Sequence, residues 1–156
     1  MFLSLLDFLG FNGPIILVAM NIIALWGRWY YILFFLLGAF LDDALNHLLK
    51  QIFQEPRPEK CKPTEFDPCT GSKHDYGMPS GHAESAVFCW TFLWCMFPKL
   101  SWFTAVGALL VVCTEIHRYV YRRHTLEQLL VGSLVGFFMA QLTLWSAEIF
   151  IRNYSK

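Results

Sequence analysis

One stretch of the chain reads Tyr76-Gly77-Met78-Pro79-Ser80-Gly81-His82, and it separates two different kinds of segment. A polar segment rich in Lys, Asp, Glu, Pro and Cys precedes it, and a long apolar run that begins at Ala83 follows it. Proline suits the first turn of a helix, and a Ser-Gly pair there leaves backbone N–H groups accessible to a phosphate. A histidine at the next position can donate a proton to the group that leaves that phosphate. Taken alone, the stretch fits a phosphate site and an ordinary helix start at a membrane surface equally well.

The composition indicates a membrane protein. The 156 residues are 56% hydrophobic and 17% aromatic, only 15% are charged, and the mean hydropathy is +0.43. These values are too apolar for a soluble domain of this length and are typical of a polytopic membrane protein. The formal net charge is zero, so nothing indicates nucleic-acid binding. The chain has no internal repeat, and its length leaves no room for a second domain, so we expect a single integral-membrane domain over residues 1–156.

The apolar runs predict an all-α bundle of about five transmembrane helices, because lipid offers no hydrogen-bond partner for backbone groups. The expected spans are Phe8–Trp26, Trp29 to about Leu49, about Pro79–Phe97, Leu100 to about His117, and about Thr125–Phe150. In this topology the second span ends, the third begins, the fourth ends and the fifth begins on one membrane face. That face therefore collects the chain's reactive and basic side chains, which are Lys50, Arg57, Ser80, His82, Arg118 and His124.

Polar residues also lie within the apolar runs. Asp43, Asn46, His47 and Lys50 share one helical face, and we expect them to point into the bundle or a wet cavity, although a helix surfacing into water would have the same pattern. Glu84 and Glu115 are acids inside apolar runs, which favours a functional role, and Glu115 is placed to orient Arg118. Arg122, His47 and His74 are each also typical of an interfacial anchor, Arg123 of a residue that contacts head groups or solvent, and His117 of a spacer or supporting group.

The basic and imidazole groups suit phosphate chemistry. Two arginines and a lysine can bind a phosphate whose charge is spread over several oxygens. Two histidines allow one to attack phosphorus while the other protonates the leaving oxygen. Gln128 lies one helical turn after His124 and is able to hold its imidazole N–H, but Glu127 is also within reach and carries a charge.

Cys61 and Cys69 lie together in the polar segment, with seven residues between them. A zinc site requires more ligands at closer spacing, and no cluster of acids suggests a magnesium site. A disulfide is the alternative if the segment faces an oxidising compartment, and the sequence leaves that open.

Three clusters together resemble the signature of the type 2 phosphatidic acid phosphatases. They are Lys50-x6-Arg57-Pro58, then Pro79-Ser80-Gly81-His82, then Arg118-x5-His124-x3-Gln128. The third part usually reads Ser-Arg-x5-His-x3-Asp, so His117 replaces the serine and Gln128 the aspartate. The local sequence is most similar to that of the dolichyl-diphosphate phosphatase branch, whose members carry Gln at the position of Gln128. Gly81 differs from that branch and follows the wider family. The resemblance covers roughly residues 29–150.

The resemblance implies a membrane phosphatase that needs no metal or cofactor. On this resemblance we expect His124 to attack phosphorus and give a phosphohistidine, His82 to protonate the leaving group, and Gln128 rather than Glu127 to orient His124. We likewise expect the phosphoryl oxygens to bind Lys50, Arg57, Arg118, the Ser80 hydroxyl and the Ser80-Gly81 backbone. The expected supporting residues around this set are Asp43, Asn46, Glu84, Glu115 and Glu127.

The expected substrate is a lipid pyrophosphate of the polyprenyl class, which is converted to the lipid monophosphate and phosphate. The alternatives are a phosphatase for phosphatidic acid or another lipid phosphate, and a non-catalytic scaffold that binds lipid phosphates. We expect a multi-pass protein in contact with membrane lipids, located in the endoplasmic reticulum if the source is eukaryotic. The resemblance and the Cys61/Cys69 pair favour a lumenal or extracytoplasmic site, whereas the distribution of basic residues does not decide the orientation. No oligomeric state follows from the sequence.

Overall fold

The computed structural model describes residues 2–69, 76–97 and 102–154, which form five helices and no strand. The helices are α1 (Phe2–Ala24), α2 (Trp29–Phe53), α3 (Gly81–Met96), α4 (Trp102–Val120) and α5 (Leu126–Tyr154). The prediction of an all-helical bundle is therefore confirmed. Four of the helices, all except α3, are long and apolar enough to cross a membrane.

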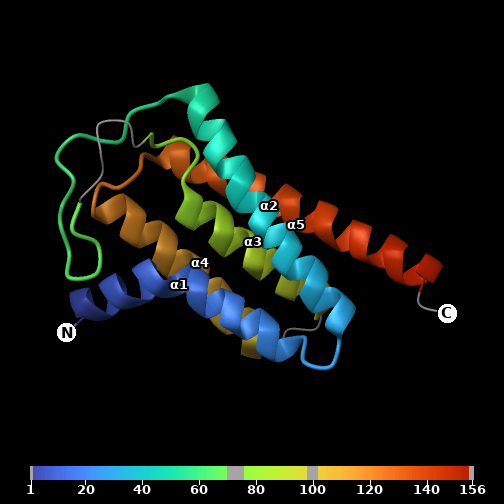
Figure 1. Ribbon diagram of the computed structural model, residues 1–156. Coiled ribbons are helices and arrows are strands. Elements are labelled where there is room, and N and C mark those ends of the chain that lie inside the picture. The colour runs from blue at the N-terminus through green and yellow to red at the C-terminus, as the bar shows by residue number, and fades with distance from the viewer. Residues whose placement is uncertain (1, 70–75, 98–101, 155–156) are drawn as a thin grey trace.

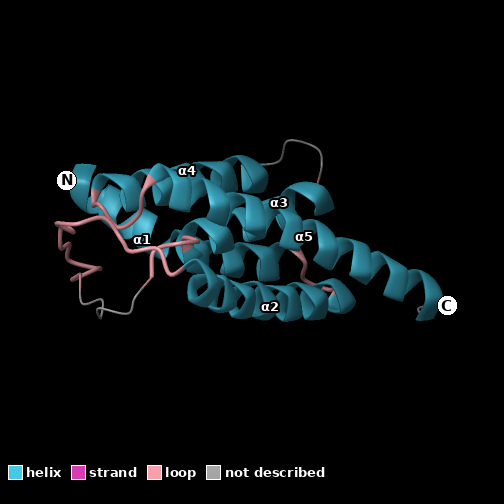
Figure 2. Cartoon of the chain, turned by 90° about the horizontal axis from the view of Figure 1, so that it is seen from above, coloured by secondary structure: helices cyan, strands magenta, loops and turns pink. Residues whose placement is uncertain are grey.

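The helix α3 lies at the centre of the bundle and contacts each of the other four (Figures 1 and 2). It has 16 residues and is shorter than the predicted span. Its start is set by Pro79, which has no N–H, and by Ser80, which has extended backbone angles (φ −74°, ψ 111°) and is the N-cap. Because protein surrounds most of α3, this helix needs neither the full length nor the apolar outer surface of a lipid-facing helix.

Aromatic packing and close helix contact hold α3 in place. Phe35 of α2 lies 5.8 Å from Phe88 and 5.2 Å from Phe92, ring centre to ring centre, and all three are fully buried. Gly132 and Gly136 of α5 approach the backbone at Ser80 and Glu84 closely. A Cβ on Gly132 would lie 2.6 Å from the Ser80 carbonyl oxygen, and one on Gly136 would collide with the Glu84 carbonyl oxygen. Small residues four apart allow such an approach, as is common between membrane helices.

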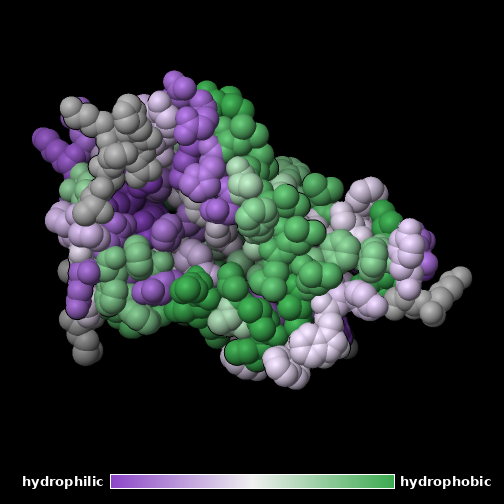
Figure 3. All heavy atoms as spheres, in the orientation of Figure 1, coloured by the Kyte–Doolittle hydropathy of each residue, from purple (hydrophilic) through white to green (hydrophobic). Residues whose placement is uncertain are grey.

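The outer surface of the bundle is largely apolar, whereas one end is polar (Figure 3). Large apolar side chains such as Ile15, Leu33, Leu109 and Leu130 are well exposed along α1, α2, α4 and α5. At the polar end α2 finishes, α3 begins, α4 finishes and α5 begins, and the segment between α2 and α3 lies over them (Figure 1). This is the shared end that the sequence predicts.

Candidate phosphate site

His124 lies in the short connection between α4 and α5 and is only 4% exposed. Its Nδ1 is 2.9 Å from the Gly77 carbonyl oxygen and 3.2 Å from Oε1 of Gln128. Both partners are hydrogen-bond acceptors, so Nδ1 carries the proton and donates it. In a neutral imidazole the other nitrogen, Nε2, then has a lone pair available.

The amide of Gln128 has a defined orientation because acceptors lie beside its nitrogen and donors lie beside its oxygen. Its Nε2 donates to Oε1 of Glu55 at 2.8 Å and to the Pro56 carbonyl at 3.0 Å, and both of these are acceptors. Its Oε1 accepts from the Thr125 backbone N–H at 3.3 Å as well as from His124. One side chain thus joins the segment after α2 to the connection that carries His124.

The stretch before α3 is held against the same glutamine. The Ser80 N–H donates to the Gln128 carbonyl at 3.1 Å. A Cβ on Gly77 would lie 2.5 Å from Oε1 of Gln128, so any larger residue there would have to displace the Gln128 amide. All three sequence clusters therefore meet at Gln128.

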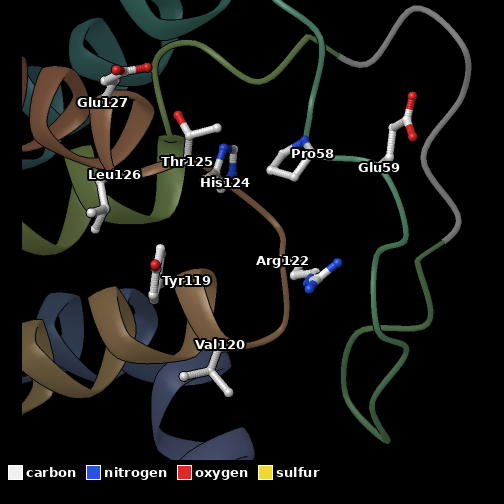
Figure 4. A pocket seen from close by; sticks show the side chains of 9 residues that line it. All are labelled: Pro58, Glu59, Tyr119, Val120, Arg122, His124, Thr125, Leu126 and Glu127. Atoms are coloured by element: carbon white, nitrogen blue, oxygen red, sulfur yellow. The ribbon is translucent and has the colours of Figure 1, made fainter.

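Glu127, the alternative partner in sequence, lies elsewhere. Its side chain is exposed, and Figure 4 shows it lying apart from the His124 ring. His124 itself lies two residues before the first residue of α5. Thr125 precedes the first residue of α5 and accepts the Gln128 N–H on Oγ1 at 3.2 Å, which is the geometry of a helix cap.

The electrostatic surroundings of His124 are strongly positive. Burial, followed by the Arg57 charge, lowers the pKa of His124 from 6.5 to about 3, and the charges of Arg118 and Lys50 act in the same direction. The hydrogen bond to Gln128 opposes this shift only in part. His124 is therefore neutral near pH 7, and three of the predicted phosphate-binding cations act on it.

His82 is the second residue of α3, and its ring lies 5.6 Å from that of Phe11 on α1. The Arg118 guanidinium lies 5.4 Å from the same phenyl ring. Arg118, His124 and Arg57 all act electrostatically on His82. The two histidines thus lie within electrostatic reach of Arg57 and Arg118.

Ser80 is fully buried, and within the described ranges its Oγ has no hydrogen-bond partner. Its backbone N–H is already bound to Gln128, so the expectation that this N–H holds phosphate is wrong. The N–H groups of Gly81 and His82 belong to the first turn of α3, which has no acceptor inside the helix.

Arg118 is 2% exposed, and its Nη1 donates to Oδ2 of Asp67 at 2.8 Å. The sequence favoured Glu115 for this partnership, and that prediction is wrong, because Glu115 accepts a 2.8 Å hydrogen bond from Ser133 on α5. Asp67 was missed, since nothing in its sequence context distinguishes it from the other acids of the polar segment. Arg123, expected at head groups or in solvent, is buried and forms an ion pair of 3.0 Å with the same aspartate.

The polar face of α2 agrees with the prediction at Asn46, which is buried, but not at Asp43 and His47. Asp43 and His47 lie 3.8 Å apart on the outer surface, with side chains about 70% exposed, so they do not point into the bundle. The buried residues are Asp42 and Asn46, because the inward face of α2 follows Phe35 and Gly38 at helical spacing. Asn46 Nδ2 donates to Oε2 of the buried Glu84 at 2.6 Å, and this hydrogen bond connects α2 to the first turn of α3.

Two further contacts connect α1 and the polar segment to the site. His117, which is fully buried, bonds through Nε2 to Oδ1 of Asp7 at 2.9 Å. Cys61 and Cys69 are joined by a disulfide.

His74 lies outside the described residues. Among the residues that the structure covers, no three His, Cys, Asp or Glu side chains gather as a metal ion would require.

An open pocket of about 560 Å³ reaches His124 from the side, between the end of α4 and the start of α5 (Figure 4). It is lined by Pro58, Glu59, Tyr119, Val120, Arg122, His124, Thr125, Leu126 and Glu127.

The fold and site define a helical membrane protein with histidines and cations gathered at one end of its bundle. The chain belongs to the PAP2 superfamily, whose pattern matches residues 29–152. It is 30% identical over 108 residues to the dolichyldiphosphatase of Saccharomyces cerevisiae, covering 64% of this chain and 44% of that protein. It is also 30% identical over 151 residues to dolichyldiphosphatase 1 of Rhinolophus ferrumequinum, covering 87% and 61%.

A solved structure has the same fold. It is the transmembrane PAP2 type phosphatidylglycerolphosphate phosphatase from Bacillus subtilis, with a TM-score of 0.68, 20% identity, and coverage of 93% of this chain and 76% of that one. The chain thus spans 44% to 61% of the length of the two dolichyldiphosphatases.

Proposed function

We propose that the chain is a membrane phosphatase that hydrolyses a polyprenyl or dolichyl diphosphate to the lipid monophosphate and inorganic phosphate. The observation that carries this proposal is the arrangement at His124. Its Nδ1 is committed to Gly77 and Gln128, its pKa of about 3 keeps it neutral, and its Nε2 keeps the lone pair. A neutral, oriented imidazole is what attack on phosphorus needs.

In the proposed first step, Nε2 of His124 attacks the terminal phosphorus. The N–P bond forms while the bond from phosphorus to the bridging oxygen breaks. The bridging oxygen leaves with the lipid monophosphate and takes a proton from His82. In the second step His82 accepts a proton from water, whose oxygen attacks the phosphohistidine. The N–P bond breaks, its electrons return to Nε2, and inorganic phosphate is released.

In this proposal the cations stabilise the negative charge on the phosphoryl oxygens. Arg57, Arg118 and Lys50 all act on His124, so a phosphoryl group beside Nε2 is exposed to three positive charges. The unpartnered Ser80 hydroxyl and the first-turn N–H groups of α3 supply neutral donors. We infer that these groups hold the phosphate and that no metal ion takes part.

The side pocket supports a lipid substrate. Tyr119, Val120 and Leu126 line it and are 52%, 41% and 63% exposed, so an apolar chain outside the bundle can lie against them while its phosphate reaches His124. The names of the relatives favour a dolichyl chain. The disulfide favours a site on the lumenal side of the endoplasmic reticulum or another oxidising side.

The test is phosphate release by the purified protein in detergent with EDTA, with polyprenyl diphosphate and phosphatidic acid as separate substrates. We expect release from the diphosphate and none from His124→Ala or His82→Ala. Release from phosphatidic acid alone would replace the substrate class by a lipid phosphate. If the folded wild type released phosphate from neither lipid, the chain would be a lipid-phosphate binder or scaffold instead.

The intermediate is tested directly. The wild type, mixed rapidly with substrate labelled at the terminal phosphate and quenched in base, should carry acid-labile label on the protein, and the His124→Ala variant should not. Label that persists without His124 would contradict the assignment of the nucleophile.

A further inference from the structure

The carboxylate of Asp67 lies between two buried arginines. Its Oδ2 accepts from Nη1 of Arg118 at 2.8 Å, and its Oδ1 pairs with Nη1 of Arg123 at 3.0 Å. Arg118 belongs to the third sequence cluster, whereas Asp67 comes from the polar segment between α2 and α3. A bridging anion of this kind reduces the repulsion between neighbouring cations and restricts how they can turn.

The loop that carries Asp67 is fixed on several sides. The Cys61–Cys69 disulfide closes it. Inside it, the Asp67 N–H donates to Oγ1 of Thr64 at 3.0 Å, and the Thr64 N–H donates to the Asp67 carbonyl at 2.9 Å. The position of the carboxylate is therefore set by the loop backbone.

The same loop is tied to two other parts of the molecule. Arg123 donates through Nη2 to the carbonyl oxygens of Asp67 and Lys62, and the Lys62 N–H donates to the Tyr121 carbonyl at 3.1 Å. On the α1 side, Phe66 packs edge-on against Phe8 at 5.5 Å. Arg123 thus holds the loop that in turn holds Arg118.

The remaining edge of Arg118 is unused. Its Nε and Nη2 lie on the same side of the guanidinium, both are buried, and neither has a hydrogen-bond partner among the described residues. Buried donors without acceptors are costly, and a paired N–H edge matches two oxygens of a phosphate. Arg118 also acts electrostatically on both His82 and His124.

We propose that Asp67 is a positioning residue, which holds Nη1 of Arg118 so that the Nε–Nη2 edge binds the phosphoryl group. This rests on the proposed function, because it assumes that the anion bound beside His124 is a phosphoryl group. Asp67 does not touch the substrate itself. The disulfide-closed loop acts on the reaction through this one carboxylate.

The test compares Asp67→Ala and Asp67→Asn with Glu65→Gln, which removes an exposed charge from the same loop. With polyprenyl diphosphate in detergent, we expect Asp67→Ala to lower kcat/KM by about tenfold to a hundredfold. Most of the loss should fall on kcat, because phosphoryl charge contacts strengthen in the transition state. Asp67→Asn should recover part of the rate, since its amide oxygen still accepts from Arg118. Glu65→Gln should remain within about twofold of the wild type.

A second readout does not depend on turnover. Inorganic phosphate and orthovanadate should raise the melting temperature of the wild type and of Glu65→Gln, and should raise that of Asp67→Ala much less. A faster Asp67→Ala enzyme would overturn the proposal and make Asp67 a competitor of phosphate. Unchanged kinetics and anion binding in both Asp67 variants would also overturn it.

The two hypotheses fail in different ways. If the wild type hydrolyses neither lipid but loses its anion response on Asp67→Ala, the proposed function fails and the positioning role stands. If the wild type is active and Asp67→Ala is equally active, only the positioning role fails.

The role of the loop is tested by a double-mutant cycle. The pair Cys61→Ser and Cys69→Ser should lower kcat by part of the Asp67→Ala effect, and should add nothing in the Asp67→Ala background. A loss that adds in full would overturn the claim that the loop acts through Asp67.

Discussion

Nδ1 of His124 lies 3.2 Å from Oε1 of Gln128, and the amide of Gln128 can be oriented in only one way. Glu55 Oε1 and the Pro56 carbonyl both require its NH₂ group, so the oxygen must face His124. A neutral amide thus occupies the position where the usual form of the motif has a carboxylate. Its oxygen accepts from Nδ1 of His124 without adding a negative charge beside the candidate phosphate site.

The first prediction concerns this glutamine. Gln128→Ala should lower kcat/KM for polyprenyl diphosphate by about tenfold to a hundredfold, because the imidazole loses one of its two acceptors and gains freedom to rotate. The loss is limited because the Gly77 carbonyl still accepts from Nδ1.

The matched control for that variant is its neighbour. Glu127→Ala removes an exposed side chain and should change kcat/KM by less than about twofold. Full activity of Gln128→Ala, beside an inactive Glu127→Ala, would assign the orienting role to Glu127.

The second prediction concerns the protonation of His124. Burial and the Arg57 charge lower its pKa to about 3, so its imidazole should stay neutral at pH 5 in the folded protein without phosphate. Histidine-labelled NMR, with His124→Gln to assign the signal, should show a proton on Nδ1 only. In the denatured protein the same residue should titrate near its ordinary value of 6.5. A folded-state midpoint near 6.5 would contradict the electrostatic account.

The stability of the fold depends on pH through the same residue. The pKa of His124 is lower in the folded than in the unfolded chain, so the unfolded chain binds the extra proton. The stability that the fold gains from keeping His124 neutral is fully present above pH 6.5, the ordinary pKa that His124 has in the unfolded chain. It is lost as the pH falls toward about 3. The melting temperature should therefore fall with acidification below pH 6.5, and His124→Gln should reduce the size of that fall.

The sequence was sufficient to predict the topology and which chemical groups share an end. Lipid permits only helices here, and the order of the spans places Lys50, Arg57, His82, Arg118 and His124 at the same end. The rotation of each helix could not be predicted in the same way. Asp43 and Asp42 are adjacent and identical in type, and only the packing of Phe35 and Gly38 determines that Asp42 faces inward.

Side-chain partners that are far apart in the sequence could not be predicted either. Asp67 reaches Arg118 across 51 positions, and Asp7 reaches His117 across 110. Both depend on how the polar segment and α1 lie over the end of the bundle, and no local periodicity records that. Glu115 was the nearest acid in sequence to Arg118, but its position on α4 directs it to Ser133 of α5.

The third prediction tests the close contact between α5 and α3. Gly136→Ala would place a Cβ against the Glu84 carbonyl oxygen, and α5 would have to move away from α3. We expect a loss of about 1–3 kcal/mol in the free energy of unfolding, the usual effect of overpacking. Thermal unfolding in detergent measures it, with the exposed Leu134→Ala on the same helix as control. Equal melting temperatures for Gly136→Ala and the wild type would show that the helices can separate at no cost.

The fourth prediction tests which face of α2 points into the bundle. Asn46→Leu keeps the size of the side chain but leaves the buried Glu84 without the 2.6 Å hydrogen bond that Asn46 donates. It should cost about 1–3 kcal/mol of stability, the penalty for an unsatisfied buried group. It should also lower kcat, because Asn46 is 3.4 Å from the Pro79 carbonyl just before α3. Asp43→Asn, three positions earlier on the exposed face, should change neither quantity. If Asp43→Asn impaired the protein as much as Asn46→Leu, the inward face of α2 would be the one that contains Asp43, and the phase found here would be wrong.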